Sequence, residues 1–255
     1  MENWKDKFLQ LNEELNTIRK KHVDFLEAAS HDLHAPLRKI SIFINRVAEK
    51  NDPSGDPATL DYISRIKNSI VEMQRLVDNL SGLAAATSST IQSIDCDLNS
   101  FVRQTILELK EQIEEKKATI HFPVLPVVKA DPIQYKQLFL NIFENAVKFC
   151  KNDIPLEIDI KVDVLSKGEI EKHQLNKKAQ YYKIVIADNG IGFASQYAEK
   201  IFEPFVRLHA KSDYPGTGLG LSIAKKIVAN HNGIIYAEGN EHVGARFILI
   251  LPANL

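Results

Sequence analysis

The first 88 residues contain no plausible β-strand, and their apolar residues follow a helical spacing. The first seam, with steps of three and four residues, is Phe8, Leu11, Leu15, Ile18, His22 and Phe25. Such steps are typical of a coiled coil. The helical pattern runs on to Lys50 and breaks at 51–57, a run dense in turn formers. A second seam follows at Leu60, Ile63, Ile66, Ile70, Met73, Val77 and Leu80. The sequence therefore predicts a long helical hairpin.

A hairpin of two helices buries too little apolar surface to be stable alone. We therefore expect a second copy to pack against it, so that a parallel homodimer closes a four-helix bundle. A lone solvated hairpin is the alternative. Within this half we expect a coiled-coil signalling helix over residues 1–20 and the dimerising hairpin over residues 21–88.

From residue 91 the pattern changes, because helical segments alternate with strand-like runs. The expected helices are Leu98–Lys117, Pro132–Cys150 and Leu219–His231. The expected strands are Ala118–Phe122, Leu156–Val164, Tyr181–Ala187, Gly233–Ala237 and Ala245–Leu251. Short turns join the late strands, which favours a mixed or antiparallel sheet with helices on one face. We expect residues 89–255 to form this α/β sandwich, so that the whole chain is α+β.

The composition excludes several classes of protein. The net charge of −1 gives no electrostatic footprint for nucleic acid. Cys96 and Cys150 have no metal-ligand spacing and agree with a reducing compartment. Apolar runs stay well short of the roughly 20 residues that span a bilayer. We expect a cytoplasmic protein without membrane contact in this chain, and the helix at residues 8–25 as the end of a transmission helix from a longer sensor.

A glycine-rich run precedes the helix expected at Leu219–His231. Gly216, Gly218 and Gly220 leave the backbone free to approach a ligand closely. The helix that follows directs its unpaired N–H groups and its positive dipole end at whatever the glycines admit, which suits an anion. The run is neither the dinucleotide fingerprint nor a P-loop. Alone it indicates only a phosphate.

A carboxylate and two glycines follow the apolar strand at Tyr181–Ala187. Asp188 stands at the end of this strand, and Gly190 and Gly192 let the chain turn sharply beside it. A carboxylate held there can accept a hydrogen bond from an exocyclic amine such as that of adenine. A plain turn is the alternative, because Asp-Asn-Gly is strong turn chemistry.

The helix expected at Pro132–Cys150 has one unusual polar face. At about 100° per residue, Asn141, Asn145 and Lys148 fall within an arc of roughly 60°. Amide oxygens suit a hard cation and an ammonium suits phosphate. A solvated face is the alternative, although asparagine is a poor helix former. We expect the opposite side to face the sheet, through Phe139, Ile142, Phe143, Ala146 and Phe149.

These motifs, together with Phe202-Glu203-Pro204-Phe205, resemble the nucleotide-binding domain of sensor histidine kinases. That family shares its ATP fold with DNA gyrase, the Hsp90 chaperones and MutL. The four motifs correspond to its N, G1, F and G2 boxes. The resemblance implies ATP bound under a mobile lid, which the chain between Phe205 and the glycines would form.

The resemblance also implies roles for single residues. Asp188 would bind the adenine amine, Asn145 would bind Mg²⁺, and Lys148 and Arg207 would lie near the phosphates. Asn141 replaces the glutamate that activates water in hydrolysing relatives, so the domain should be a poor ATPase. The remaining nucleotide-binding residues would be Gly190, Gly192, Gly216, Thr217, Gly218, Leu219 and Gly220.

The first helix contains a histidine with unusual neighbours. His31 is followed by Asp32, whose carboxylate can fix the tautomer that leaves Nε2 free to attack. Pro36 should bend the helix here. The stretch resembles the H box of the same kinases and favours His31 over His34 as phosphoacceptor. Where the family often has Thr or Asn, Ala35 has no hydrogen-bonding group, which counts against phosphatase activity at this position.

Together these features predict a histidine autokinase. ATP would phosphorylate His31, with Asp32 as orienter or general base, and the phosphoryl group would pass to an aspartate on a response regulator receiver domain. A degenerate kinase acting as a nucleotide-binding scaffold is one alternative. An ATP-hydrolysing chaperone or topoisomerase-like machine is the other, and Asn141 argues against it.

Overall fold

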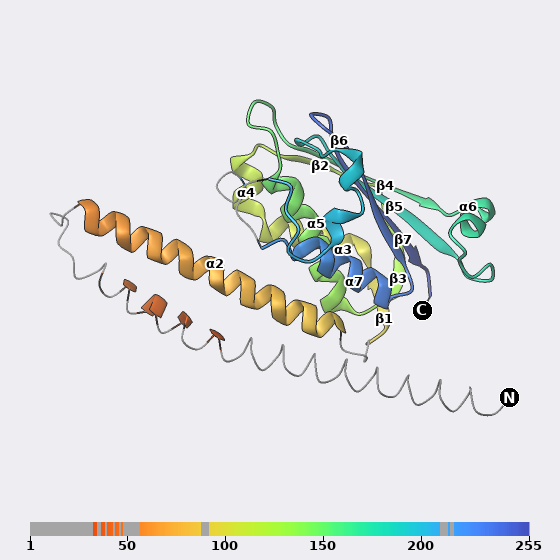
Figure 1. Cartoon of the computed structure of the whole chain (residues 1–255). Coiled ribbons are helices and arrows are strands. Elements are labelled where there is room, and N and C mark those ends of the chain that lie inside the picture. The colour runs from red at the N-terminus through yellow and green to blue at the C-terminus, as the bar shows by residue number, and fades with distance from the viewer. Residues whose placement is uncertain are drawn as a thin grey trace. The chain divides into compact units, whose positions relative to one another are not determined.

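The chain divides into two compact units, residues 1–89 and 90–255. The computed structural model describes residues 33–34, 37–38, 40–42, 44–45, 47, 57–87, 92–209, 214 and 217–254. The seam at Phe8–Phe25, residues 51–56 of the expected break, and the residues His31, Asp32 and Gly216 lie outside this set. We describe each unit by itself (Figure 1).

The described part of the N-terminal unit has two helical segments. The described residues between 33 and 47 are helical, and helix α2 spans Pro57–Thr87. Ile63, Ile70 and Val77 stand seven residues apart on α2 and are buried, which is the spacing of a helix-packing seam. His34 Nε2 lies 3.4 Å from Asp78 Oδ1, so a polar contact also joins the two segments.

The C-terminal unit is built on a five-stranded mixed sheet. Its strands are β2 (Thr119–His121), β4 (Glu157–Val164), β5 (Tyr181–Asp188), β6 (Ile234–Asn240) and β7 (Gly244–Pro252). Their order is β2-β4-β5-β7-β6. Strand β2 runs parallel to β4, and every other neighbouring pair is antiparallel. The expected α+β class is confirmed, and the strands lie where their apolar alternation predicts them.

Three helices cover one face of this sheet (Figure 1). They are α3 (Leu98–Glu108), α5 (Pro132–Lys148) and α7 (Gly220–Asn230). Ile158 and Ile160 on β4 are buried, whereas their neighbours Glu157, Asp159 and Lys161 are exposed. Because side chains alternate between the faces of a strand, this edge of the sheet has one covered face and one open face.

Four short elements depart from the expected pattern. Strands β1 (Ile94–Asp97) and β3 (Val127–Ala130) form a separate antiparallel pair. Helix α6 (Lys167–Lys172) begins with a capping box and lies between β4 and β5. The helix expected at Leu98–Lys117 is interrupted at Leu109, after which α4 spans Lys110–Glu115.

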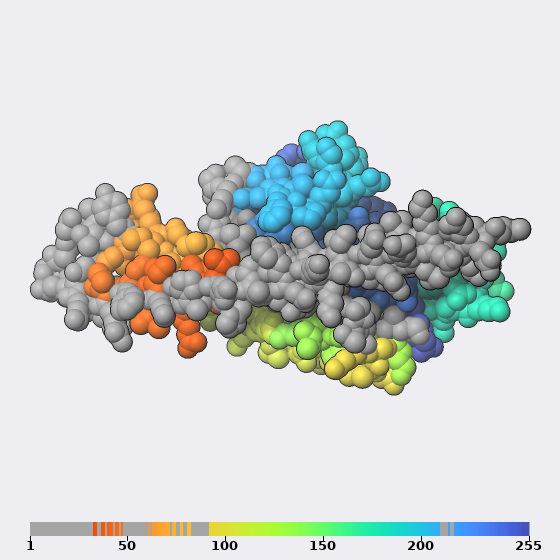
Figure 2. Space-filling model, turned by 60° about the horizontal axis from the view of Figure 1, so that its bottom comes forward, coloured from red at the N-terminus to blue at the C-terminus, as the bar shows by residue number. Residues whose placement is uncertain are grey.

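The segment between β5 and α7 contains two 3-10 turns, η1 (Ser195–Tyr197) and η2 (Lys200–Phe202). In the space-filling view this segment, coloured cyan to light blue, stands out from the surface of the domain (Figure 2). Phe202 is buried, and the ammonium of Lys225 on α7 lies 5.7 Å from the centre of its ring. The segment therefore contacts α7 through η2.

A buried polar network ties the start of α5 to the end of α7. The Asp131 side chain caps α5 by accepting hydrogen bonds from Ile133 N at 3.0 Å and Gln134 N at 3.1 Å. Its other oxygen accepts a hydrogen bond from Gln92 N at 3.2 Å. The backbone N–H of Asp131 donates to Nε2 of the fully buried His231, at 3.0 Å. This network fixes the two helices that carry most of the predicted site.

Candidate functional site

Helix α5 presents its predicted polar face at the centre of the candidate site. Asn141 is only 2% exposed, whereas Asn145 and Lys148 are half-buried. On the opposite side the apolar residues Phe139, Ile142, Phe143 and Ala146 are buried, as expected. The apolar side of α5 thus packs in the core, and the amides of Asn141 and Asn145 and the ammonium of Lys148 lie on its polar side.

Phe149 departs from this expectation. It is the C-cap residue of α5 and is half-buried. Its ring centre lies 5.0 Å from that of Tyr214 and 5.9 Å from that of His209, both in the segment before α7. Because the helix ends at Lys148, Phe149 leaves the apolar side and packs with these two rings.

The buried carboxamide of Asn141 lies between Gln137 and Gly220. Gln137 Nε2 donates to Asn141 Oδ1 at 2.8 Å, one helical turn away. A Cβ atom placed on Gly220 would lie 3.6 Å from the same oxygen. Asn141 Nδ2 is buried without a hydrogen-bond partner. The N-terminus of α7 therefore lies against a side chain that has an unused donor.

Asp188 is held at the end of β5 by one of its two oxygens. Oδ1 accepts hydrogen bonds from Gly190 N at 2.9 Å and Ala245 N at 3.2 Å. Burial raises the pKa of this carboxyl, while the two hydrogen bonds and the charge of Lys151 oppose the rise. Oδ2 makes neither of these hydrogen bonds, which suits an amine of a ligand.

The turn after Asp188 packs against the C-terminal end of α5. Ile191 N donates to Phe149 O at 2.9 Å. Gly192 has φ of 65°, and a Cβ there would collide with the carbonyl oxygens of Asn240 and Gly244. Only glycine adopts this positive φ without strain and leaves room for these two carbonyl oxygens. The two predicted motifs, on α5 and after β5, thus meet at the end of α5.

Two cations come together beside this point. Burial lowers the pKa of the Lys148 ammonium, the neighbouring Arg207 guanidinium lowers it further, and the Glu144 carboxylate opposes both. The Lys148 ammonium lies 4.6 Å from the centre of the Phe149 ring. Arg207 also donates Nη2–H to the carbonyl oxygen of Tyr214 at 2.8 Å. Two adjacent cations repel each other, and an anion bound between them would relieve that repulsion.

The end of the glycine-rich run enters α7. Gly218 has φ of 75°, and its carbonyl oxygen accepts a hydrogen bond from Phe205 N at 3.0 Å. Thr217 Oγ1 accepts one from Leu219 N at 3.2 Å. Leu219 is the N-cap residue of α7 and provides no side-chain hydrogen bond. The first N–H groups of α7 are therefore available to an anion.

The predicted phosphoacceptor is His31, with Asp32 as its neighbour. His31 and Asp32 lie outside the described residues, as does Gly216. The competing candidate, His34, is described and contacts Asp78.

Within the described ranges there is no cluster of three or more His, Cys, Asp or Glu residues that could hold a metal ion. Among the helices that the structure describes, none combines the length and the apolar character of a membrane span.

The sequence interpretation missed several residues of the site. Gln137 could have been found, because glutamine four residues before Asn141 is a helical i, i+4 pair. The backbone N–H of Ala245 and the rings of Tyr214 and His209 had no comparable signal, since they come from distant parts of the chain.

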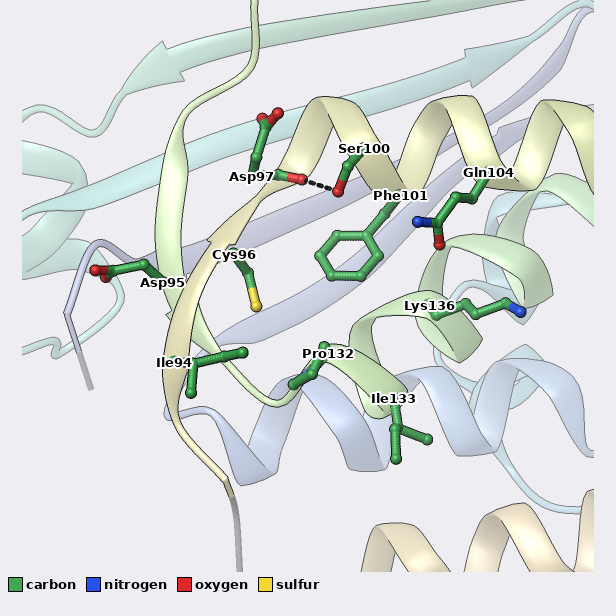
Figure 3. A pocket seen from close by; sticks show the side chains of 10 residues that line it. All are labelled: Ile94, Asp95, Cys96, Asp97, Ser100, Phe101, Gln104, Pro132, Ile133 and Lys136. Carbon is green, nitrogen blue, oxygen red and sulfur yellow. Dashed lines mark hydrogen bonds between the residues drawn. The ribbon is translucent and has the colours of Figure 1, made fainter.

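A separate pocket of about 550 Å³ lies on another part of the domain (Figure 3). It is formed by β1, α3 and the first turn of α5, with Cys96 and Phe101 at its centre. In Figure 3 the Ser100 hydroxyl donates to Asp97 O, at 2.6 Å. None of the predicted site residues lines this pocket.

The site among the described residues meets the needs of a nucleotide. It has one free carboxylate oxygen for a base amine, two cations and an uncapped helix N-terminus for phosphates, and an amide face for a cation. Asp188 lies near the C-terminal end of α5, where Lys148 and Arg207 also lie. The N-terminus of α7 lies against Asn141, in the middle of α5.

Comparison with known proteins agrees with this description. Residues 130–255 match the model of the family described as histidine kinase-, DNA gyrase B- and HSP90-like ATPase. The phytochrome-like protein Cph1 of Synechocystis sp. is 32% identical over 228 residues, which are 89% of this chain and 29% of the relative. The sensor-like histidine kinase ycf26 of Porphyra purpurea is 30% identical over 244 residues, which are 93% of this chain and 36% of the relative.

Two solved structures share the fold. Full-length ShkA in complex with AMPPNP superposes with a TM-score of 0.68 and 23% identity, covering 91% of this chain and 46% of that one. The histidine kinase ThkA in complex with the response regulator protein TrrA gives a TM-score of 0.59 and 22% identity, covering 95% and 66%. The present chain spans about a third of the length of the two curated relatives.

Proposed function

We propose that the chain is the catalytic core of a sensor histidine kinase. Residues 130–255 match the model of the histidine kinase-, DNA gyrase B- and HSP90-like ATPases, and the similarity to the two relatives extends over 89% and 93% of the chain. In this proposal the chain transfers the γ-phosphoryl group of ATP to its own His31. This proposal depends on one observation. The turn after Asp188 and the Lys148–Arg207 pair lie at the C-terminal end of α5, and the N-terminus of α7 lies against Asn141 on its polar face.

Each part of the site has a role in binding ATP. Asp188 accepts a hydrogen bond from the adenine amine through Oδ2, since Oδ1 already accepts two. Gly190 and Gly192 keep the turn beside it open. Lys148 and Arg207 neutralise phosphate charge, and the N–H groups that follow Leu219 bind phosphate oxygens. Gly216, Thr217, Gly218 and Gly220 allow the close approach.

Asn145 is our candidate ligand for Mg²⁺. It stands on the polar face of α5, half-buried, between Asn141 and Lys148. A carboxamide oxygen is a ligand that Mg²⁺ accepts, together with phosphate oxygens and water. When bound, the ion would neutralise charge on the phosphates.

His31 is the proposed nucleophile. Its Nε2 would attack the γ-phosphorus in line, forming an N–P bond as the bond to the bridging oxygen of ADP breaks. Asp32 would hold the Nδ1–H tautomer, which keeps the Nε2 lone pair free. Positioning and charge neutralisation supply most of the catalysis in such transfers.

We further propose a homodimer through the N-terminal unit. Ile66 and Met73 lie seven residues apart on α2 and are 45% and 43% exposed, although they are large and apolar. Leu33 and Ile40 on the first helical segment are similarly exposed. A second seam on the hairpin is what a parallel four-helix bundle would cover.

The proposed acceptor of the phosphoryl group is an aspartate on a response regulator. The neighbour ThkA, which was solved with such a regulator, supports this partner class. We propose a cytoplasmic location, because Cys96 and Cys150 are buried free thiols, as a reducing compartment allows.

The kinase activity can be tested by incubating the chain with γ-labelled ATP and Mg²⁺. We expect label on the protein that is lost in acid and stable in base, as phosphohistidine is. His31→Gln should abolish the label, while the matched change His34→Gln should keep it. Label that survives His31→Gln would disprove the assignment of His31.

Asp188→Asn provides a second control in the same experiment. It should abolish labelling by removing nucleotide binding, because an amide in place of the carboxylate weakens the contact to the adenine amine. Asp159→Asn, an exposed change on β4, should label normally. A wild-type chain that binds ATP without labelling itself would favour the scaffold alternative.

A further inference from the structure

Gln137 has a contact that gives the buried Asn141 side chain a defined orientation. A carboxamide has one acceptor and one donor end, and either end can face a ligand. Here Gln137 Nε2 donates to Asn141 Oδ1 at 2.8 Å. The oxygen end is therefore engaged, and the donor end, Nδ2, is the one that has no partner.

An unpaired donor inside a protein is costly, and a bound water, ion or ligand group is one way to satisfy it. Asn141 is 2% exposed, so bulk water does not satisfy Nδ2. Gly220, the first residue of α7, lies against the Asn141 side chain. The Asn141 atom nearest to a Cβ on Gly220 is Oδ1, at 3.6 Å, followed by Cγ, at 3.7 Å, to which the unpaired Nδ2 is bonded. The carboxamide that bears the unpaired donor therefore lies beside a helix N-terminus whose N–H groups attract an anion.

We propose that Gln137 is a positioning residue that holds Asn141 with its Nδ2–H group directed at a phosphate oxygen of the bound nucleotide. The inference rests on the proposed function, because the anion is taken to be a nucleotide phosphate. It revises one expectation from the sequence. Both asparagines of α5 offered oxygens to a cation, but only Asn145 keeps that role, whereas Asn141 acts as a donor.

Three substitutions separate this role from packing. Gln137→Glu reverses the polarity, because a carboxylate accepts only, so Asn141 must rotate its Nδ2 toward it and present Oδ1 to the phosphate. Gln137→Met keeps the size and removes the hydrogen bond. Ile133→Glu adds the same charge one helical turn earlier on α5, at a position that is 79% exposed, and is the control for charge alone.

The test compares ADP with adenosine, both without Mg²⁺, by isothermal titration of the full chain. For Gln137→Glu we expect ADP affinity to fall roughly tenfold while adenosine affinity stays within about twofold. Gln137→Met should lose less ADP affinity than Gln137→Glu. Ile133→Glu should change ADP affinity by less than about threefold, and raised salt should reduce its effect.

A side-chain signal supplies a direct readout. The ¹⁵N–¹H pair of the Asn141 carboxamide, assigned by its loss in Asn141→Asp, should shift when ADP is added to the wild type. In Gln137→Glu that shift should be lost.

The outcomes are distinguishable. Wild-type protein that binds neither ADP nor adenosine would overturn the proposed function itself. Wild-type protein that binds ADP, with Gln137→Glu binding it equally tightly, would overturn only the role of Gln137. Equal losses for ADP and adenosine would also overturn it, since they would indicate a structural role.

Discussion

His231 has both ring nitrogens engaged inside the C-terminal domain. Nε2 accepts the Asp131 N–H at 3.0 Å, and Nδ1 lies 2.8 Å from Ile227 O. A carbonyl only accepts, so Nδ1 carries the proton and the ring is neutral. Burial lowers the pKa of His231, and the Ile227 contact and the Asp131 charge only partly oppose this.

This arrangement predicts a loss of stability in mild acid. Above the unfolded-state pKa of about 6.5, His231 is neutral in both states. As the pH falls from there toward the lower folded-state pKa, the unfolded chain binds a proton that the folded chain does not. Stability should then fall by up to about 1.4 kcal/mol per pH unit for this one group.

Urea denaturation at pH 7.5 and pH 5.5 measures this effect. Near-ultraviolet circular dichroism is a suitable signal, because all tyrosines except Tyr62 lie in the C-terminal domain. We expect the part of the pH dependence due to His231 to be absent from His231→Gln, whatever that change does to stability at pH 7.5. Identical pH dependence in both proteins would show that His231 is not the titrating group.

At the residue scale, the sequence located the motifs but not their partners. Asp188 could be singled out because it ends an apolar strand and precedes two glycines. Its second contact, the N–H of Ala245, comes from a strand 57 residues later. The burial of Asn141 was hidden for a similar reason, since the Gly220 end of α7 that lies against it is a tertiary contact.

At the scale of elements, α5 depends on its N-cap more than α3 does. Asp131 is 8% exposed and caps two N–H groups of α5 while also accepting from Gln92 N. Asp97 is exposed and caps α3 through a single backbone N–H, that of Asn99, at 2.9 Å.

We therefore predict unequal costs for the two alanine substitutions. Asp131→Ala should lower the free energy of unfolding by about 2 kcal/mol, and Asp97→Ala by about 1 kcal/mol. Urea denaturation at neutral pH measures both. Equal costs would contradict the view that the buried network at Asp131 fixes the start of α5. Asp131→Asn, which keeps an acceptor oxygen, should recover part of the loss.

The long elements were predictable and the short ones were not. Helices α5 and α7 have three or more turns with a continuous apolar side, which gives a strong periodic signal. Strand β1 has four residues, of which only Cys96 is buried. Such a short strand shows no repeated alternation of buried and exposed side chains that the sequence could reveal. Helix α6 has six residues and one buried side chain, Ile170, and its signal was the cap at Ser166.

At the scale of the whole molecule, the exposed stripe of α2 predicts self-association. Changing both Ile66 and Met73 to glutamate should convert a dimer into a monomer, because like charges would then face each other across a parallel bundle. Light scattering after size-exclusion chromatography measures the mass. Asn68→Glu, an exposed change on the same helix, is the control and should leave the dimer intact.

A monomeric wild type would contradict the bundle, and so would a double variant that remains dimeric. Neither result would touch the nucleotide site, since that site is built from residues 130–255 alone. The proposed homodimer and the proposed nucleotide site can thus be disproved independently of each other.

The hydrogen bond from Gln92 to Asp131 has a mechanical consequence. Where the chain enters the C-terminal domain, the same carboxylate holds the incoming backbone and closes the first turn of α5. A pull on the entering chain would load this carboxylate first. Releasing it would fray the start of the helix that bears Asn141, so Asp131 is the point at which tension in the polypeptide could become a change in the geometry around a nucleotide.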